Sequence, residues 1–236
     1  MTIRAVLFDA AGTLIELAES VGETYARIAE RFGVALPASR LDDAFRRVWA
    51  SAPPMVFPDA APEAVPALER GWWREVVRST FRAADSTVRF DDFDAFFAAL
   101  YDVYSGAPAW RPRPGARQAL GALRAAGLAV GVVSNFDHRL DKILEAMGMT
   151  ELLDFVGTPS RCGSRKPERV PFAAALDALG VPAASAVFVG DDPAMDLAAA
   201  RAAGLSALDV HQLDSLCELP DVIATLDDSP EEAPTP

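Results

Sequence analysis

Short apolar runs along the chain alternate with longer stretches in which apolar residues recur at helical spacing. The first run, residues 3–8, contains β-branched side chains and ends abruptly at Asp9, which two alanines, Gly12 and Thr13 follow. This pattern predicts a buried strand that ends in a carboxylate and then turns sharply. Asp9 is therefore either a residue that caps the turn or a carboxylate at the edge of a sheet, where α/β proteins bind ligands.

From residue 17 to residue 107 the apolar positions are spaced as in helices. Four such stripes are present: Val21, Tyr25, Ile28 and Phe32; Leu41, Phe45, Val48 and Trp49; Leu68, Trp72, Trp73, Val76 and Val77; and Phe93, Phe96, Phe97, Leu100, Tyr101 and Tyr104. Prolines at positions 53, 54, 58, 62 and 66 separate the second stripe from the third, because proline disrupts a helix interior. We expect four helices whose aromatic side chains form the interior of a small bundle.

From Trp110 onward, short apolar strands alternate with helices that end at glycines. The predicted strands are 128–133, 155–156, 186–189 and 205–210, and the predicted helices are 116–126, 138–147, 170–179 and 193–203. This alternation predicts parallel βαβ units. The expected fold is α/β: a Rossmann-like parallel-sheet core over 1–16 and 108–226, with a helical domain over 17–107 inserted into it. Residues 227–236 are rich in Pro, Asp and Glu and are predicted to be a disordered acidic tail.

Charge and cysteine content narrow the classes of protein. The net charge of −12 disfavours a nucleic-acid partner, because phosphate backbones require a basic surface. Cys162 and Cys217 lack the spacing of a metal site, and we expect free thiols in a reducing compartment. The sequence has neither a signal-peptide pattern nor an apolar run of membrane-spanning length. We therefore expect a cytoplasmic protein without a membrane partner.

Polar segments follow four of the predicted strands. They are Asp9 with Thr13; Ser134 with Asn135; Lys166 with Pro167; and Asp191 and Asp192 with Asp196. Each segment alone has an ordinary explanation, such as a helix cap or a solvated charge. Together they place carboxylates, a hydroxyl and one of only two lysines at the edge of the sheet where ligands bind. Carboxylates gathered there suit Mg²⁺, which takes one or two of them together with phosphate oxygens.

These four segments resemble the four motifs of the haloacid dehalogenase-like hydrolase superfamily, in the type with a helical cap inserted after the first motif. The resemblance covers nearly the whole chain except the acidic tail. Residues 131–140 and 72–77 are most similar to the branch that contains haloacid dehalogenase-like hydrolase domain-containing protein 3. Most members of the superfamily are phosphatases. The resemblance therefore implies a Mg²⁺ cofactor, a small phosphorylated substrate and a cap that closes over the site.

The resemblance also implies a nucleophile and a set of metal ligands. Asp9 would attack phosphorus and form an aspartyl-phosphate. Mg²⁺ would be held by Asp9, the backbone carbonyl of Ala11 and Asp191, and would offset the repulsion between carboxylate and phosphate. Asp192 and Asp196 would orient the waters of the metal or bind it less directly.

The remaining motif residues are implied to bind the phosphoryl group. Ser134 and the backbone amide of Asn135 would donate hydrogen bonds to phosphoryl oxygens. Lys166 would bridge the nucleophile and the phosphoryl charge. Thr13 belongs with the nucleophile among the expected catalytic residues.

Ala11 departs from the pattern of the family's phosphatases, which carry an aspartate two residues after the nucleophile. That aspartate protonates the leaving alkoxide and then activates water. General acid–base catalysis is typically worth ~10²–10⁴-fold, so simple alkyl phosphates should be poor substrates. Either the enzyme is restricted to good leaving groups, or another group supplies the proton, with Glu16, Asp137 and His138 nearby in sequence.

Three other functions explain Ala11 less well. Phosphonoacetaldehyde hydrolases share the Asp-x-Ala pattern but need a lysine in the cap, and residues 17–107 contain none. A 2-haloacid dehalogenase needs no acid, but it works without metal, and the pair Asp191 and Asp192 argues against it. A binding or regulatory protein with the same fold is the third alternative, against which the intact Asp9 and Lys166 argue.

Overall fold

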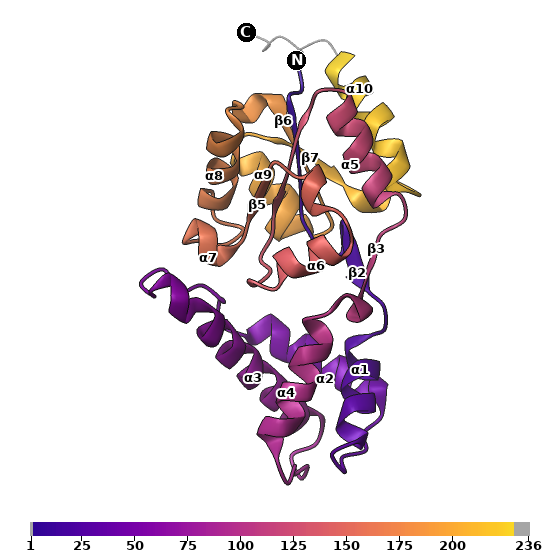
Figure 1. Ribbon diagram of the computed structural model, residues 1–236, viewed down its shortest axis with the longest axis vertical. Coiled ribbons are helices and arrows are strands. Elements are labelled where there is room, and N and C mark those ends of the chain that lie inside the picture. Colours follow the sequence, from indigo (N-terminus) through magenta and orange to yellow (C-terminus); the bar gives the residue numbers. More distant parts are fainter. Residues whose placement is uncertain (1, 229–236) are drawn as a thin grey trace. The chain divides into compact units, whose positions relative to one another are not determined.

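The computed structural model describes residues 2–228, and the chain divides into two compact units (Figure 1). Of the described residues, 2–16 and 112–228 form the first, here called the core unit, and Leu17–Arg111 form the second, the helical unit. Of the predicted acidic tail, residues 229–236 lie outside the described residues. No described helix is long and apolar enough to cross a membrane.

The core unit is organised around a parallel five-stranded sheet with the order β5-β4-β1-β6-β7. Its strands are β1 (Ala5–Phe8), β4 (Ala129–Val133), β5 (Phe155–Gly157), β6 (Ala186–Gly190) and β7 (Ser206–Asp209). The parallel sheet confirms the predicted α/β fold. Within it, β1 is the central strand, and Phe8 is paired with Val132 of β4 and Val189 of β6. The residue that follows Phe8 therefore lies between the carboxyl ends of β4 and β6.

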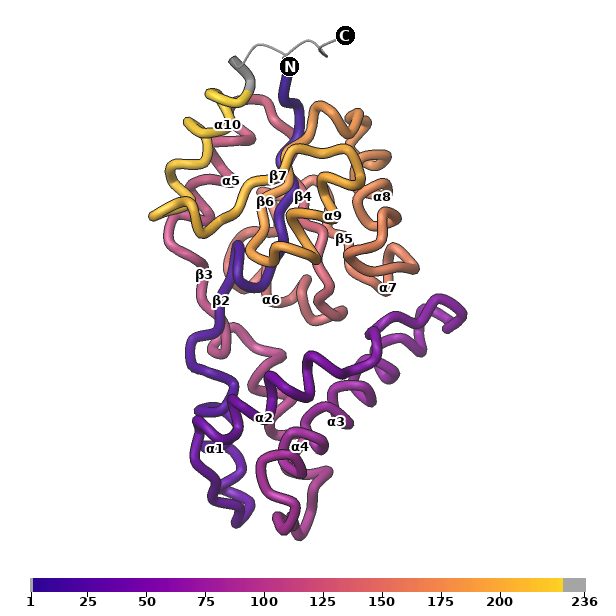
Figure 2. The backbone as a smooth tube through the Cα atoms, turned by 180° about the vertical axis from the view of Figure 1, so that it is seen from behind, coloured from indigo at the N-terminus to yellow at the C-terminus, as the bar shows by residue number. Residues whose placement is uncertain are grey.

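Helices cover both faces of this sheet. They are α5 (Ala116–Ala125), α6 (Leu140–Ala146), α7 (Pro159–Cys162), α8 (Val170–Leu179), α9 (Ala199–Ala202) and α10 (Leu219–Asp228). Figures 1 and 2 show α5 and α10 on one side of the strands and α8 on the other. Because both faces are covered, every side chain of β1 is buried, as expected for the centre of a parallel sheet.

The predicted helix over 193–203 is divided in two. Its first part, Pro193–Ala198, is a π-helix, and α9 follows it. π-Helical turns are rare and are frequent at functional sites. This wider turn contains Asp196, one of the predicted site residues.

The remaining elements of the chain are short. β2 (Ile15–Leu17) and β3 (Trp110–Pro112) form a two-stranded sheet. Short 3₁₀ turns are found at Pro62–Ala64, Ala107–Ala109, Thr150–Leu152, Ala183–Ser185, Val210–Gln212 and Leu216–Glu218.

The helical unit contains four helices, in the order that the apolar spacing predicts. They are α1 (Val21–Glu30), α2 (Ala38–Ser51), α3 (Val65–Ala84) and α4 (Phe93–Tyr104). Ser20 and Glu23 form a capping box at the start of α1, which satisfies backbone N–H groups that the helix leaves unpaired. Stacked and edge-to-face aromatic rings, among them Tyr25, Phe81 and Phe96, fill the interior.

One aromatic residue of the predicted interior is exposed. Trp49, near the end of α2, is 47 % exposed, so its assignment to the bundle interior was wrong. Its ring stacks on Phe45 and Trp73 and meets Trp72 edge-on. Trp49 thus packs against α3 while almost half of its side chain stays exposed, and helical spacing alone does not distinguish such a position from the interior.

The core beneath the sheet depends on contacts between α8 and β6. Phe172 of α8 is fully buried, and its ring meets Phe188 of β6 edge-on, with ring centroids 5.2 Å apart. Phe172→Ala removes these contacts and leaves a cavity, so we expect a loss of about 3–5 kcal/mol in unfolding free energy. Val170→Ala, in the same helix at a position 50 % exposed, should change it by no more than about 0.5 kcal/mol. Urea denaturation of both variants tests this difference, and equal losses would contradict the packing described.

Candidate functional site

Asp9 and Lys166 meet at the carboxyl end of the sheet. The Asp9 backbone N–H donates to the Val189 carbonyl at 2.9 Å, which continues the pairing of β1 with β6 by one residue. The Lys166 ammonium donates to Asp9 Oδ1 at 2.7 Å and also to Asp196 Oδ1. Lys166 is 2 % exposed and Asp9 is 8 % exposed. Residues 157 positions apart therefore form a buried ion pair.

The protonation of Lys166 follows from this environment. Burial alone disfavours the charged ammonium and lowers its pKa, but the charges of Asp9 and Asp196 outweigh burial and raise the pKa above its usual value. The ring of Phe188 also lies 5.2 Å from the ammonium nitrogen, at cation–π distance. Lys166 is therefore a fixed positive charge at neutral pH.

Asp196 links the ammonium to the loop after β6. Its Oδ1 accepts from Lys166, and its Oδ2 accepts from the backbone N–H groups of Asp191 and Asp192, each at 3.2 Å. A Cβ at Gly190 would lie 2.5 Å from the Asp196 Cβ, so the glycine allows this close approach. Burial and the neighbouring Asp9 charge raise the pKa of Asp196 to about 6.

Asp192 points its carboxylate at the helix that follows it. Its Oδ1 accepts from the N–H groups of Ala194 and Met195, each at 2.8 Å, and its side chain is exposed. It therefore acts as the N-cap of the π-helix. This carboxylate fixes where the π-helix begins, and the start of that helix sets the position of Asp196.

The carboxylates of Asp9, Asp191 and Asp196 form a group suited to a cation. Each offers one oxygen, and these oxygens all lie within 4.8 Å of one another. Thr13 Oγ1 donates to Asp191 Oδ1 at 3.1 Å. Burial and the Asp9 charge raise the pKa of Asp191, because both disfavour the ionised form of its carboxyl group. Three carboxylates against one ammonium leave an excess of negative charge that a divalent cation would offset.

The loop after β1 passes close to Asp191. Gly12 has a φ of +95°, and a Cβ there would lie 2.5 Å from Asp191 Oδ2. Arg113 fixes this loop from the other side: its Nη1 donates to the Gly12 carbonyl at 2.7 Å, and its backbone N–H donates to the Leu14 carbonyl at 2.9 Å. Ala11, in the same loop, is half-buried. Arg113 is not among the predicted site residues, because nothing in its local sequence distinguishes it from a solvated arginine.

Ser134 and Asn135 follow β4 on the other side of β1. Ser134 is 6 % exposed, and its Oγ accepts from the backbone N–H of Phe136 at 3.3 Å. The side-chain amide of Asn135 does not turn toward solvent. It forms two hydrogen bonds with the backbone of Lys166, at 2.8 Å and 3.0 Å. Lys166 thus contacts one residue from each of the other three predicted segments: Asp9, Asn135 and Asp196.

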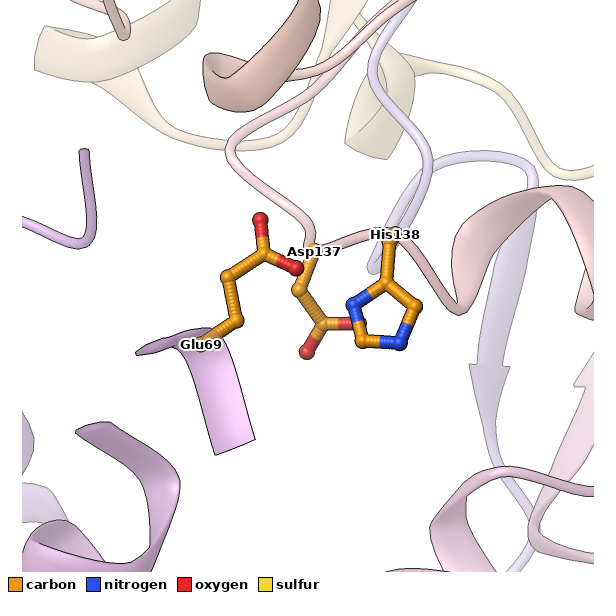
Figure 3. A group of neighbouring side chains, drawn as sticks. All are labelled: Glu69, Asp137 and His138. Atoms are coloured by element: carbon orange, nitrogen blue, oxygen red, sulfur yellow. The ribbon is translucent and has the colours of Figure 1, made fainter. Parts of the chain in front are cut away.

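The loop beyond Asn135 contains two of the residues considered as a proton source. Figure 3 shows Asp137 and His138 as neighbours on this loop; Glu69, also drawn, belongs to the helical unit. Arg139 Nε donates to Asp137 Oδ1 at 2.9 Å and to Oδ2 at 3.1 Å, and both side chains are buried. The Asp137 carboxylate is therefore held in a buried ion pair with Arg139. His138 is half-buried.

Comparisons with known proteins show which proteins this chain resembles. The family model of haloacid dehalogenase-like hydrolases matches residues 3–204. Haloacid dehalogenase-like hydrolase domain-containing protein 3 of Xenopus laevis is 34% identical over 214 residues, which are 89% of this chain and 85% of that protein. A phosphoglycolate phosphatase of Rhodospirillum rubrum is 39% identical over 135 residues, which are 52% of this chain and 54% of that protein. The crystal structure of a dehalogenase with an intermediate complex has a similar fold, with a TM-score of 0.69, 21% identity and coverage of 94% of this chain and 97% of that chain.

The contact between Gly12 and Asp191 predicts a difference between two glycine substitutions. Gly127 has a φ of +82° with open space where a Cβ would lie, whereas a Cβ at Gly12 would collide with the Asp191 carboxylate. Both alanine variants incur the backbone cost of a positive φ, roughly 1–2 kcal/mol. Gly12→Ala should lose about 1–3 kcal/mol more through the collision. Urea denaturation of both variants measures the difference, and equal losses would show that the loop does not approach Asp191 closely.

Proposed function

The chain belongs to the haloacid dehalogenase-like hydrolase family, and on that premise we propose that it is a Mg²⁺-dependent phosphatase. Its substrate is a small phosphorylated compound, and its intermediate is an aspartyl-phosphate. The observation that carries the proposal is the buried Lys166 ammonium held between Asp9 and Asp196. The similarity to a phosphoglycolate phosphatase over about half of this chain supports phosphate monoesters as the substrate class.

Asp9 is the proposed nucleophile. Because Lys166 binds Oδ1, we assign the attack on phosphorus to Oδ2. The bond between phosphorus and the leaving oxygen then breaks, and its electron pair stays on that oxygen. In a second step water attacks phosphorus, which releases phosphate and restores the Asp9 carboxylate. The charge of Lys166 offsets the repulsion between the carboxylate and the incoming phosphate.

The donor set at the end of β1 fits Mg²⁺. Carboxylate and carbonyl oxygens are the ligands that this ion prefers, and Asp9, Asp191 and the Ala11 carbonyl are the proposed ones. When bound, the ion supplies positive charge that offsets the excess of carboxylates and the charge of the phosphoryl group. Asp196 already engages both of its oxygens. We assign it to holding Lys166 and the loop after β6, with Asp192 fixing the same loop from outside.

Ser134 is the proposed phosphoryl-binding hydroxyl. It lies at the end of the strand beside β1, and a serine hydroxyl can donate to an acceptor oxygen while it accepts from another group. Its Oγ accepts from Phe136, which leaves the hydroxyl proton for a phosphoryl oxygen. The backbone N–H of Asn135 is assigned to a second phosphoryl oxygen, and Thr13 keeps Asp191 oriented through its hydrogen bond.

Ala11 sets the limits of this chemistry. An alanine side chain has no proton to give to a leaving alkoxide and no base to activate water. Substrates with good leaving groups should therefore react faster than alkyl phosphates. Hydrolysis of the aspartyl-phosphate should be slow as well, because no base at position 11 activates the water. The intermediate should therefore persist longer than it would beside a general base.

Dehalogenation of 2-haloacids is the second candidate function. A halide leaves without a proton, and Ala11 is compatible with such a leaving group. The grouping of Asp9, Asp191 and Asp196 argues against it, since a metal-free reaction gains nothing from three neighbouring carboxylates. Substrate tests separate the two functions.

Turnover of p-nitrophenyl phosphate and acetyl phosphate, with and without Mg²⁺, tests the proposed function. We expect hydrolysis of both that requires Mg²⁺ and that Asp9→Asn abolishes, because an amide is not a nucleophile here. Retained activity in Asp9→Asn would show that the nucleophile is another residue. Turnover of 2-chloropropionate without added metal would instead support the dehalogenase, and inactivity toward all three substrates would favour a binding or regulatory protein.

The missing acid predicts the effect of Ala11→Asp. With glycerol phosphate, whose leaving group needs a proton, kcat/KM should rise by about 10²-fold or more. With p-nitrophenyl phosphate the rise should be far smaller, because nitrophenolate leaves unprotonated. Equal gains on both substrates would mean that protonation of the leaving group is not what limits the site.

A further inference from the structure

We propose that the side-chain amide of Asn135 is a positioning residue that holds the Lys166 peptide and thereby places the Lys166 ammonium between Asp9 and Asp196. The inference rests on the proposed function for its kinetic consequence, but its structural part is tested separately below. The role differs from that of the Asn135 backbone N–H, which is assigned to the phosphoryl group.

The two hydrogen bonds are reciprocal. The backbone N–H of Lys166 donates to Asn135 Oδ1 at 2.8 Å, and Asn135 Nδ2 donates to the Lys166 carbonyl at 3.0 Å. The amide thus satisfies both backbone groups of one residue, as a neighbouring strand would. A side-chain amide suits this role because it carries a donor and an acceptor in one rigid plane.

Lys166 needs such an anchor because no regular element supports it. It lies between α7 and α8, in a segment where neither a helix nor a strand is formed. Near it, the backbone N–H of Glu168 donates to the Arg165 carbonyl at 2.9 Å, and Arg165 Nε donates to the Lys166 carbonyl at 3.1 Å. These contacts stay within the same loop. Asn135 ties the loop to the end of β4, next to the central strand.

A lysine side chain has four rotatable bonds, so a fixed ammonium requires a fixed backbone. The carboxylates of Asp9 and Asp196 hold the charged end, and Asn135 holds the other end, 31 positions away in the chain. The same asparagine follows Ser134, the proposed phosphoryl-binding hydroxyl. Its side chain therefore sets the distance between that hydroxyl and the ammonium, and a misplacement of about 1 Å can cost ~10²-fold in rate.

A double-mutant cycle tests the kinetic part. Asn135→Ala should lower kcat for p-nitrophenyl phosphate by about 10–10²-fold, with a smaller change in KM. In a Lys166→Ala background the same substitution should change kcat less than about threefold, because a residue that acts through Lys166 has nothing left to position. An equal loss in both backgrounds would overturn the proposal, since it would mean that Asn135 acts on the substrate directly or supports the fold in general.

Asn135→Asp is the second variant, for the case that the alanine variant does not fold. It keeps the shape and the acceptor for the Lys166 N–H but loses the donor to the Lys166 carbonyl, so an intermediate loss of kcat is expected. In the Lys166→Ala background, Asn135→Asp should likewise change kcat less than it does in the wild-type background. Wild-type kcat in Asn135→Asp would contradict the proposal.

The structural part is tested without activity. The chain has two lysines, and the other, Lys142, is exposed on α6. Protein labelled with ¹⁵N-lysine should therefore give two backbone amide signals. The variant Lys142→Arg removes one of them, which assigns the remaining signal to Lys166. Its hydrogen exchange should be at least about tenfold faster in Asn135→Ala, whereas the Lys142 amide should exchange equally in Asn135→Ala and the wild type.

An unchanged exchange rate at Lys166 would overturn the anchoring itself. An inactive wild type with protected Lys166 exchange that depends on Asn135 would instead count against the proposed phosphatase alone. The two failures are therefore distinguishable.

Discussion

The buried contact of the Lys166 ammonium with Asp9 and Asp196 is the interaction on which the site depends. Charges removed from water are costly unless they are paired, and removing one partner leaves the others buried and uncompensated. With Asp191 nearby, the carboxylates outnumber the ammonium. The arrangement therefore favours groups that bring positive charge, and the oxygen donors fit the divalent cation of the proposed function.

The fold brings these charges together through its topology. β1 lies between β4 and β6 in a parallel sheet, so Asp9, Ser134 and Asp191 all follow the carboxyl ends of neighbouring strands. Backbone contacts then set the finer positions. Gly12 and Gly190 allow close approach to Asp191 and Asp196.

The fold class and the grouping of the motif segments follow from the sequence, because strand periodicity and parallel topology determine which residues share one edge of a sheet. Details that depend on side-chain geometry do not. The family resemblance implied that Asp196 would orient the waters of a metal or bind it less directly, but not that a π-helix would direct both of its oxygens to Lys166 and backbone amides. The side-chain contacts of Asn135 and Arg113 join segments distant in sequence, and helical spacing does not show that Trp49 stays exposed beside Trp73.

The most direct measurement is acid-quenched labelling with radioactive acetyl phosphate and Mg²⁺, followed by peptide mapping. Because Ala11 provides no base for the second step, the phosphoryl-enzyme should accumulate enough to be isolated. The account predicts one phosphoryl group on the peptide that contains Asp9, released by hydroxylamine as expected of an acyl phosphate. Label on another residue, or rapid turnover with no protein-bound phosphate at any time, would contradict it.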